Sequence, residues 1–383
     1  MPVASTEPLR VLHVVGGLGP GGIESFLMSV YRQIDRTKVQ FDFMVPDDVE
    51  YHYSQEVRVL GGKIYVVPYG KKDYFASNRR LREFYKEKGY QVVHLHDGHL
   101  HSMQPLEQAK EVGVPVRVLH AHCARGEVKT TRDLVDAVVH EINKRRIMCA
   151  THFFACSRDA ADYFGFEERG DQTRWRTILN GINVEKFSYS LIERRVKRDE
   201  LGLEEKDFLI GNVGRLENQK NQALLVRAMP QIRKKIPSAK LLIVGDGTLK
   251  PDLLRLAESL SVQDDCIFLS NRRDVAELCD AMDVFAFPSI YEGLGIALVE
   301  AEANGLPCVV SPGVPEEALA TKNCEICGID NGGDPNEWAD AIVRAASKGR
   351  LEEAPTQVEA AGFSVKRTAQ QLEDFYLTSI ERQ

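Results

Sequence analysis

The stretch RVLHVVGGLGPGGIESFLM, residues 10–28, decides the fold class because it contains a strand, a turn and a helix in succession. Val11–Val15 is a short apolar run typical of a buried strand, and the glycines after it predict a tight turn. Apolar residues then recur at helical spacing and form one face: Ile23, Phe26, Leu27, Val30, Tyr31 and Ile34. This order predicts the first unit of a parallel α/β sheet.

The same glycine turn satisfies G-x-G-x-x-G from Gly17 to Gly22, which is the pattern of a dinucleotide site. Asp42 follows 20 positions after Gly22, but it falls inside the apolar run Val39–Val45 rather than at its end, where a ribose-binding acid is expected. An NAD-dependent oxidoreductase is therefore one alternative. The other use of the turn is for Gly21 and Gly22 to let the backbone approach a ligand.

The alternation of strand and helix continues along the chain and then starts again. Further strand-like runs cover 63–67, 92–95, 116–120 and 152–155 in the first half, and 208–213, 240–244, 267–269, 284–287 and 308–311 in the second. A polar, charged span at 193–200 separates the halves and predicts a linker near 184–206. We therefore expect two doubly wound, Rossmann-like α/β domains facing across a cleft: residues 1–186 with a returning helix at 364–383, and residues 187–363.

Composition excludes several classes of protein. The 383 residues are 43% hydrophobic and 27% charged, and a net charge of −7 argues against general nucleic-acid binding. No apolar run approaches the roughly 20 residues that span a bilayer, and the first residues do not resemble a signal peptide. Cys324 and Cys327 form a lone CxxC without a second pair, so a metal or redox site there is disfavoured. We expect a cytoplasmic protein with reduced cysteines.

The most informative stretch is FPSIYEGLGIALVE, residues 287–300, where a strand ends and a helix begins. Gly293 and Gly295 let a ligand approach the amides at the helix N-terminus, which suit a phosphate. Glu292 and Glu300 are eight positions apart, and a carboxylate within the helix can accept hydrogen bonds from ribose hydroxyls. The alternative is a capped surface helix with two solvated acids.

Two more glycine turns follow predicted strands. Arg215 and Lys220 come after the strand at 208–213, where two cations can neutralise a diphosphate, although a loose pair of cations on a loop is often only solvated. Val-Gly-Asp-Gly at 244–247 follows the next strand and is expected to shape the floor of the site.

Together these motifs resemble the family 4 glycosyltransferases, retaining enzymes with the GT-B fold. The matching residues are the Glu292/Glu300 pair, Gly214-Arg215 with Lys220-Asn221, the turn at 244–247, Gly21–Glu24, and Asn180–Asn183, in which Asn183 replaces the usual aspartate. The blocks at 39–43, 61–65 and 304–308 are similar to bacterial exopolysaccharide and capsule glycosyltransferases. The resemblance implies a hexosyl- or N-acetylhexosaminyl-transferase that uses a nucleotide sugar.

The resemblance also implies a role for each matching position. Arg215 and Lys220 would hold the donor diphosphate, Glu300 the ribose, and Glu292 the sugar hydroxyls. The remaining donor-binding positions are Gly21, Gly22, Asn271, Arg272, Gly293, Leu294 and Gly295. The family's catalytic histidine follows the fifth strand, where His122 is the first choice and His120 the second.

The chain contains no D-x-D and no acid clearly placed as a nucleophile. This predicts metal-independent, front-face retention with no cofactor besides the co-substrate, most often a UDP-sugar in this family. The acceptor would be a glycan or a lipid-linked glycan. A non-catalytic partner subunit that binds a nucleotide sugar is a further alternative.

A basic stretch with interleaved aromatic residues covers residues 71–88 and includes Lys71, Lys72, Tyr74 and Phe75. One interpretation is peripheral contact with the anionic inner face of the plasma membrane, where a lipid-linked acceptor would lie. The other is a solvated helix that packs its apolar side on the sheet.

Overall fold

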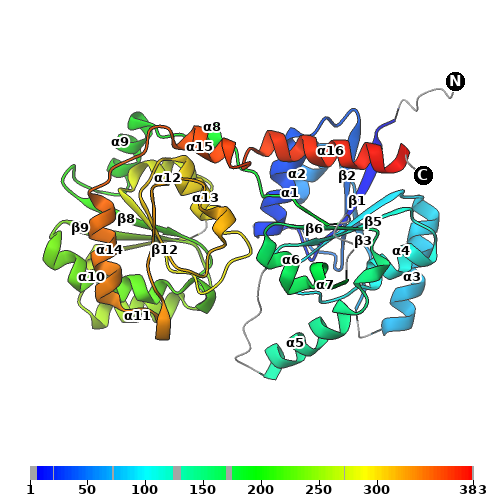
Figure 1. Cartoon of the computed structure of the whole chain (residues 1–383), viewed down its shortest axis with the longest axis horizontal. Coiled ribbons are helices and arrows are strands. Elements are labelled where there is room, and N and C mark those ends of the chain that lie inside the picture. Colours follow the sequence, from blue (N-terminus) through cyan, green and yellow to red (C-terminus); the bar gives the residue numbers. More distant parts are fainter. Residues whose placement is uncertain are drawn as a thin grey trace. The chain divides into compact units, whose positions relative to one another are not determined.

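The computed structural model describes residues 7–19, 21–70, 73–123, 131–169, 175–270 and 272–381. The chain divides into two compact units, which Figure 1 displays. Unit 1 comprises Met1–Gly181 and Val365–Gln383, and unit 2 comprises Ile182–Ser364. The boundaries lie after residues 181 and 364, whereas the sequence placed them after 186 and 363. Each unit contains one parallel sheet with helices on both sides, which confirms two Rossmann-like domains.

Unit 1 has a seven-stranded sheet in the order β3-β2-β1-β4-β5-β6-β7. Its strands are β1 (Leu9–Val14), β2 (Val39–Val45), β3 (Ile64–Val66), β4 (Val92–Asp97), β5 (Val116–Ala121), β6 (His152–Ala155) and β7 (Trp175–Thr177). Its helices are α1 (Gly22–Gln33), α2 (Ser54–Val59), α3 (Tyr74–Lys88), α4 (Gln104–Glu111), α5 (Thr131–Lys144), η2 (Ile147–Cys149), α6 (Arg158–Phe164), α7 (Phe166–Arg169) and α16 (Val365–Glu381).

Unit 2 has a six-stranded sheet in the order β10-β9-β8-β11-β12-β13. Its strands are β8 (Phe208–Val213), β9 (Ala239–Val244), β10 (Cys266–Leu269), β11 (Val284–Phe287), β12 (Cys308–Val310) and β13 (Cys324–Ile326). Its helices are α8 (Val184–Phe187), α9 (Leu191–Glu200), η3 (Asn218–Lys220), α10 (Gln222–Lys235), α11 (Lys250–Ser259), η4 (Gln263–Asp265), α12 (Val275–Ala281), α13 (Ile296–Ala303), η5 (Glu316–Ala318), η6 (Asp330–Gly332), α14 (Pro335–Ala346) and α15 (Ala354–Ala360).

The central strands are buried on both faces because helices cover both sides of each sheet. All seven residues of β2 are buried, as are the last four of β9. The edge strands β7 and β13 were not predicted. Each has only three residues, and none of these residues is fully buried, so neither leaves an apolar run in the sequence.

The charged span at 193–200, predicted as a linker, instead belongs to α9 of unit 2. Arg194 donates to the carbonyls of Asp280, Ala281 and Met282, at the carboxyl end of α12. A helix end leaves such carbonyls without intrahelical partners, so the arginine stabilises this end. The prediction failed because a run of charges is typical of a linker, whereas several of these charges bind the neighbouring helix.

The last helix, α16, completes unit 1. It lies beside α1 (Figure 1). Its residues Leu372, Phe375 and Tyr376 are buried in the same core cluster as residues of the sheet. This returning helix brings the Tyr376 hydroxyl to 2.7 Å from Nδ1 of His94 in β4. Residues from the two ends of the chain therefore share one core.

Candidate functional site

The Arg215 loop of unit 2 follows β8 and was predicted to bind a diphosphate. The Arg215 side chain is exposed, and no hydrogen bond or ion pair engages its guanidinium anywhere in the described chain. The backbone of the residue is fixed, because Gln222 donates to its carbonyl at 2.9 Å. The loop thus holds a cation in place while leaving its charge uncompensated.

The glycine turn after β9 supports this loop. Leu216 donates its amide to the Asp246 carbonyl at 2.9 Å, and Leu249 donates to the Leu216 carbonyl at 3.0 Å. A Cβ at Gly245 would overlap the Gly214 carbonyl, and one at Gly247 would overlap the backbone of Leu216. Only glycine therefore allows the two loops to pack this closely.

The loop between β11 and α13 is tied to the Arg215 loop. The Ile290 amide donates to the Gln219 carbonyl at 2.7 Å, and the Gln219 side chain donates to the Tyr291 carbonyl at 2.9 Å. The Glu292 amide donates to the Gly313 carbonyl at 2.9 Å. These bonds bring the two motifs singled out from the sequence to one edge of the sheet.

Lys220 and Glu292 form an ion pair, with Nζ 2.5 Å from Oε1. The two side chains are only 14% and 6% exposed, and the ammonium lies 5.0 Å from the ring centroid of Phe287. A buried charge requires a partner, so each residue makes the other's burial tolerable. Sequence spacing could not have revealed this pair, because the residues are 72 positions apart.

Helix α13 begins after Gly295, whose φ of 88° favours glycine. Within the described residues, no hydrogen-bond acceptor is assigned to the amides of Leu294 and Gly295. Unpaired amides at a helix N-terminus attract anions. This arrangement can bind a phosphate or a sugar oxygen.

Glu300 lies in the second turn of α13. Its carboxylate accepts no hydrogen bond from the described residues, and burial raises its pKa to about 7, with Lys186 opposing this increase. Part of the side chain nevertheless stays accessible. An enclosed carboxyl without a protein partner is suited to accept hydrogen bonds from a ligand's hydroxyls.

The predicted donor-binding positions Asn271 and Arg272 follow β10. Ser270 accepts a hydrogen bond from Lys250 at 2.8 Å. Arg272 is bound to Asp274 at 2.7 Å and to Glu200 at 2.7 Å, so its guanidinium is already paired inside unit 2. Asn271 lies outside the described residues.

In unit 1 the glycine turn precedes α1, with Gly21 at the N-cap and the exposed Gly22 as the first helical residue. A Cβ at Gly22 would meet no atom within 4 Å, so the backbone is open at this point. Asp42 is fully buried and accepts hydrogen bonds from Arg10, the Lys63 amide and Tyr90. Its oxygens serve the core, which removes the ribose-binding acid that a dinucleotide site needs.

The two candidate histidines differ in their surroundings. His120 is fully buried, and neither of its ring nitrogens has a hydrogen-bond partner among the described residues. His122 follows β5 and is partly exposed, with Nε2 3.0 Å from Nδ1 of His96. Burial lowers the pKa of His122 to about 3, against the opposing field of Asp97. His122 is therefore neutral near pH 7.

Sequence reasoning missed the histidines behind this pair. His13, His94 and His96 lie on β1 and β4, and His13 Nδ1 is 2.9 Å from His96 Nε2. The signal was present in the sequence: Leu-His-Val, Val-His-Leu-His and Leu-His-Ala-His place histidines at alternate positions of three predicted strands.

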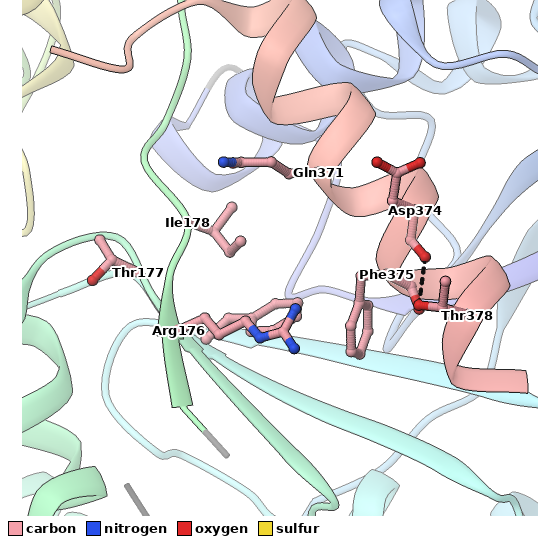
Figure 2. A pocket seen from close by; sticks show the side chains of 8 residues that line it. Arg176, Thr177, Ile178, Gln371, Asp374, Phe375 and Thr378 are labelled. Carbon is pink, nitrogen blue, oxygen red and sulfur yellow. Dashed lines mark hydrogen bonds between the residues drawn. The ribbon is translucent and has the colours of Figure 1, made fainter. Parts of the chain in front are cut away.

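Unit 1 also contains a cavity of about 300 Å³, which Figure 2 shows. It is lined by Phe154, Arg176, Thr177, Ile178, Gln371, Asp374, Phe375 and Thr378. None of the predicted site residues is among them. The Arg176 guanidinium lies 5.9 Å from the Phe375 ring centroid, and Thr378 donates to the Asp374 carbonyl at 2.7 Å.

Known families match both halves of the chain. The profile of Glycosyl transferases group 1 matches residues 193–361, and that of Glycosyltransferase Family 4 matches residues 20–186. The chain is 31% identical over 381 residues to the "Putative glycosyltransferase EpsF" of Bacillus subtilis, covering 97% of each protein. It is 27% identical over 311 residues to the Escherichia coli UDP-Gal:alpha-D-GlcNAc-diphosphoundecaprenol alpha-1,3-galactosyltransferase, covering 78% of each.

Solved structures agree on the fold. The crystal structure of Anabaena HepE in complex with UDP-glucose matches with a TM-score of 0.76 at 19% identity, over 96% of this chain and 99% of that one. WaaG, a glycosyltransferase of lipopolysaccharide biosynthesis, matches with a TM-score of 0.68 at 16% identity, over 95% and 99%. The chain is a glycosyltransferase that belongs to family 4 and has the GT-B fold.

Proposed function

We propose that this glycosyltransferase transfers a sugar, with retention of configuration, from a UDP-sugar to a glycan or lipid-linked acceptor in exopolysaccharide or capsule biosynthesis. Arg215, Lys220 and the amides of Leu294 and Gly295 would hold the diphosphate. Glu300 would accept the ribose hydroxyls, and Glu292 would contact the sugar. No metal ion or cofactor is needed for these contacts.

One observation carries the proposal: groups suited to one diphosphate and one ribose remain unsatisfied at a single sheet edge. The exposed cation of Arg215 and the amides of Leu294 and Gly295 before α13, which have no acceptor among the described residues, suit phosphate oxygens. The enclosed carboxyl of Glu300 suits hydroxyl donors. The direct bonds between the two loops fix the spacing of these groups.

The relatives support the choice of donor and acceptor. The name of the E. coli relative specifies UDP-galactose and a diphosphoundecaprenol acceptor, and HepE was solved with UDP-glucose. We extend a UDP-sugar and a lipid-linked acceptor from them to this chain. The similarity to EpsF favours the exopolysaccharide setting.

The proposed step is front-face substitution. The bond from the sugar's anomeric carbon to the phosphate oxygen breaks, and the acceptor oxygen bonds to the same face of that carbon. The acceptor's proton passes to the departing diphosphate oxygen. The cation and the amides stabilise the charge that grows on the diphosphate, while His122 steadies the sugar.

A donor screen with the purified chain tests this function, with released UDP as the readout and EDTA present throughout. Thermal unfolding with UDP and with NAD is measured in parallel. We expect UDP to raise the melting temperature, NAD to have no effect, and one UDP-sugar to turn over with a lipid-linked glycan. Stabilisation by UDP without turnover on any acceptor would indicate a non-catalytic subunit instead.

We propose in addition that unit 1 contacts the membrane surface peripherally from the cytoplasm. Phe75, near the start of α3, is 86% exposed, whereas Leu81 and Tyr85 of the same helix are buried against the core. Lys71 and Lys72 lie outside the described residues. Among the described helices, none is both long and apolar enough to cross a bilayer.

Sedimentation with anionic vesicles at low salt tests this contact. We expect Phe75→Ser to reduce the bound fraction by a few-fold, because one exposed aromatic side chain contributes a modest apolar term. The exposed Val59 of α2 offers a control, Val59→Ser, which should bind as the wild type does. Wild-type protein that stays in the supernatant would exclude this mode of binding.

A further inference from the structure

Five histidines of unit 1 lie on one face of three adjacent strands. His13 of β1 is in register with His94 of β4, and His96 is in register with His120 of β5. His122 is the first residue after β5, and its ring centroid lies 5.2 Å from that of His96. Residues opposite one another in a parallel sheet point to the same face, so the rings form one continuous cluster.

Three of these rings form a hydrogen-bonded chain. His13 Nδ1 lies 2.9 Å from His96 Nε2, and His96 Nδ1 lies 3.0 Å from His122 Nε2. His96 thus uses both ring nitrogens. The outer nitrogens of the chain, His13 Nε2 and His122 Nδ1, are buried and have no hydrogen-bond partner among the described residues.

A count of protons limits the arrangements of this chain. Burial lowers the pKa of all three histidines, so each ring is neutral and carries one N–H. Two N–H groups make the two hydrogen bonds. The third N–H must therefore lie on an outer nitrogen, either His13 Nε2 or His122 Nδ1.

The surroundings favour His122. The ring of His13 packs among aromatic side chains, 4.1 Å from Phe41 and 5.7 Å from Phe43, and no described residue forms a hydrogen bond with its Nε2. An orphaned N–H in such a core is rarer than an orphaned acceptor. His122 lies beyond the end of β5, and its amide donates to the Asp97 carbonyl at 3.1 Å. The negative charge of Asp97 also acts on its ring.

We propose that His96, supported by His13, is a positioning residue that holds His122 as a neutral imidazole with its proton on Nδ1. In the proposed function, His122 would then act on the donor sugar as an N–H donor rather than as an acceptor. In this form it cannot accept a proton at Nδ1, and its only lone pair, on Nε2, is occupied by His96. This inference rests on the proposed function for the role of His122, but the position of the proton does not depend on it.

A bound metal ion is the competing use of the cluster. His13, His94 and His96 offer nitrogens within 4.8 Å of one another, as do His96, His120 and His122. Neither group contains a carboxylate or a thiolate, so a divalent ion would bring uncompensated charge into an aromatic core. A metal ion at either group would also occupy a nitrogen lone pair that the hydrogen-bonded chain of histidines uses.

The test is ¹⁵N spectroscopy of protein labelled at histidine, which distinguishes protonated from unprotonated ring nitrogens. His96→Phe removes the group that donates to His122, whereas His96→Asn keeps an N–H close to the position of Nδ1. As a control, His94→Phe with Tyr376→Phe removes both partners of the neighbouring hydrogen bond and leaves the chain intact.

We expect the signals of His122 to report a protonated Nδ1 in the wild type, in His96→Asn and in the control. In His96→Phe we expect a mixture of the two tautomers. Wild-type protein with the proton on Nε2 would overturn the proposal, as would an unchanged tautomer in His96→Phe. A stoichiometric metal ion retained by purified wild-type protein would overturn it too.

Activity provides a separate readout. We expect His96→Phe to lower kcat about 10- to 100-fold with little change in UDP affinity, and His96→Asn to recover most of the loss. A protein with the predicted tautomer but without transfer activity would refute the proposed function alone. Equal loss of kcat in His96→Asn and His96→Phe would overturn the positioning role.

Discussion

The two sheets of this protein have the same parallel architecture but opposite chemistry at their carboxyl edges. Unit 2 presents charges: the exposed Arg215, the buried Lys220–Glu292 pair and the enclosed Glu300. Unit 1 presents neutral imidazoles. All ten histidines of the chain lie between residues 13 and 152, so unit 2 has none. The fold supplies the edge, and the residues placed there decide which ligand group can bind.

Burial acts on both edges but has opposite consequences for charge at neutral pH. It disfavours the charged form of any group, so it lowers the pKa of the histidines and raises that of Glu300 to about 7. The histidines of unit 1 are therefore uncharged at neutral pH, and unit 2 keeps a carboxyl close to its titration point. The comparison predicts that the two units respond differently to acid.

The largest expected effect is a divergence in stability between pH 7 and pH 5.5. The folded histidines have pKa values well below the ordinary 6.5, so the unfolded state binds more protons and unit 1 loses stability as the pH falls. The folded Glu300 has a pKa above the ordinary 4.5, so unit 2 gains stability over the same range. Each group that titrates contributes about 1.4 kcal/mol per pH unit.

Each unit contains one tryptophan, Trp175 in unit 1 and Trp338 in unit 2. Trp338→Phe leaves fluorescence that reports unit 1, and Trp175→Phe leaves fluorescence that reports unit 2. Urea midpoints of the two variants should move apart as the pH falls from 7 to 5.5. Midpoints that fall together would show that the contrast between the edges is not electrostatic.

The next effect concerns the buried ion pair. Lys220→Ala leaves the Glu292 carboxylate buried without its partner, and we expect unit 2 to lose about 3–5 kcal/mol of unfolding free energy. Lys250→Ala is the matched control, because its pair with Asp246 is 30% and 42% exposed and should contribute less than about 1 kcal/mol. Urea unfolding monitored by Trp338 fluorescence measures both losses of unfolding free energy. Equal losses in the two variants would refute the conclusion that burial makes the Lys220–Glu292 pair important for stability.

The sequence predicted the scaffold well because strand and helix periodicity are local. The runs at 39–45, 152–155, 208–213 and 284–287 coincide with β2, β6, β8 and β11. The turn at 244–247 was expected to shape the floor of the site, and the clash of any Cβ there with Gly214 and Leu216 gives the physical reason. The predicted linker was wrong because the partners of Arg194 in α9 lie 86 and 87 positions away in α12.

The parts of the site that the sequence did not reveal depend on distant residues. Whether Lys220 is solvated or paired depends on Glu292, and whether His122 is free depends on His96 and, through it, on His13. Charge and protonation are set by such contacts rather than by residue type. Alternation of histidines on predicted strands was the one local signal that pointed to the cluster.

A third prediction separates catalysis from stability at the charged edge. Arg215→Ala removes an exposed cation whose guanidinium has no partner among the described residues, so the unfolding free energy should change by less than about 0.5 kcal/mol. Turnover of the UDP-sugar should fall about 10²- to 10³-fold because the departing diphosphate loses its stabilising charge. Arg227→Ala changes an exposed arginine on α10 and should turn over at the wild-type rate. Near-normal turnover in Arg215→Ala would remove this residue from the site.

The smallest effect tests whether Glu300 is kept for binding at the expense of stability. Above pH 7 the partly buried Glu300 carboxyl is an anion, which lowers the unfolding free energy of the wild type. Glu300→Gln removes this cost, so the variant should exceed the wild type in unfolding free energy by about 1–2 kcal/mol more at pH 8 than at pH 5.5. Its affinity for UDP should fall about tenfold, because a neutral amide accepts ribose hydrogen bonds more weakly than a carboxylate. Glu258→Gln on the exposed side of α11 should change neither quantity.

A stability gain that does not vary with pH would contradict the raised pKa of Glu300, and unchanged UDP affinity would contradict ribose binding by Glu300. If both results are as predicted, the charged edge of unit 2 keeps Glu300 for ligand binding although this group lowers the stability of the fold. The neutral histidine edge of unit 1 would differ in this respect.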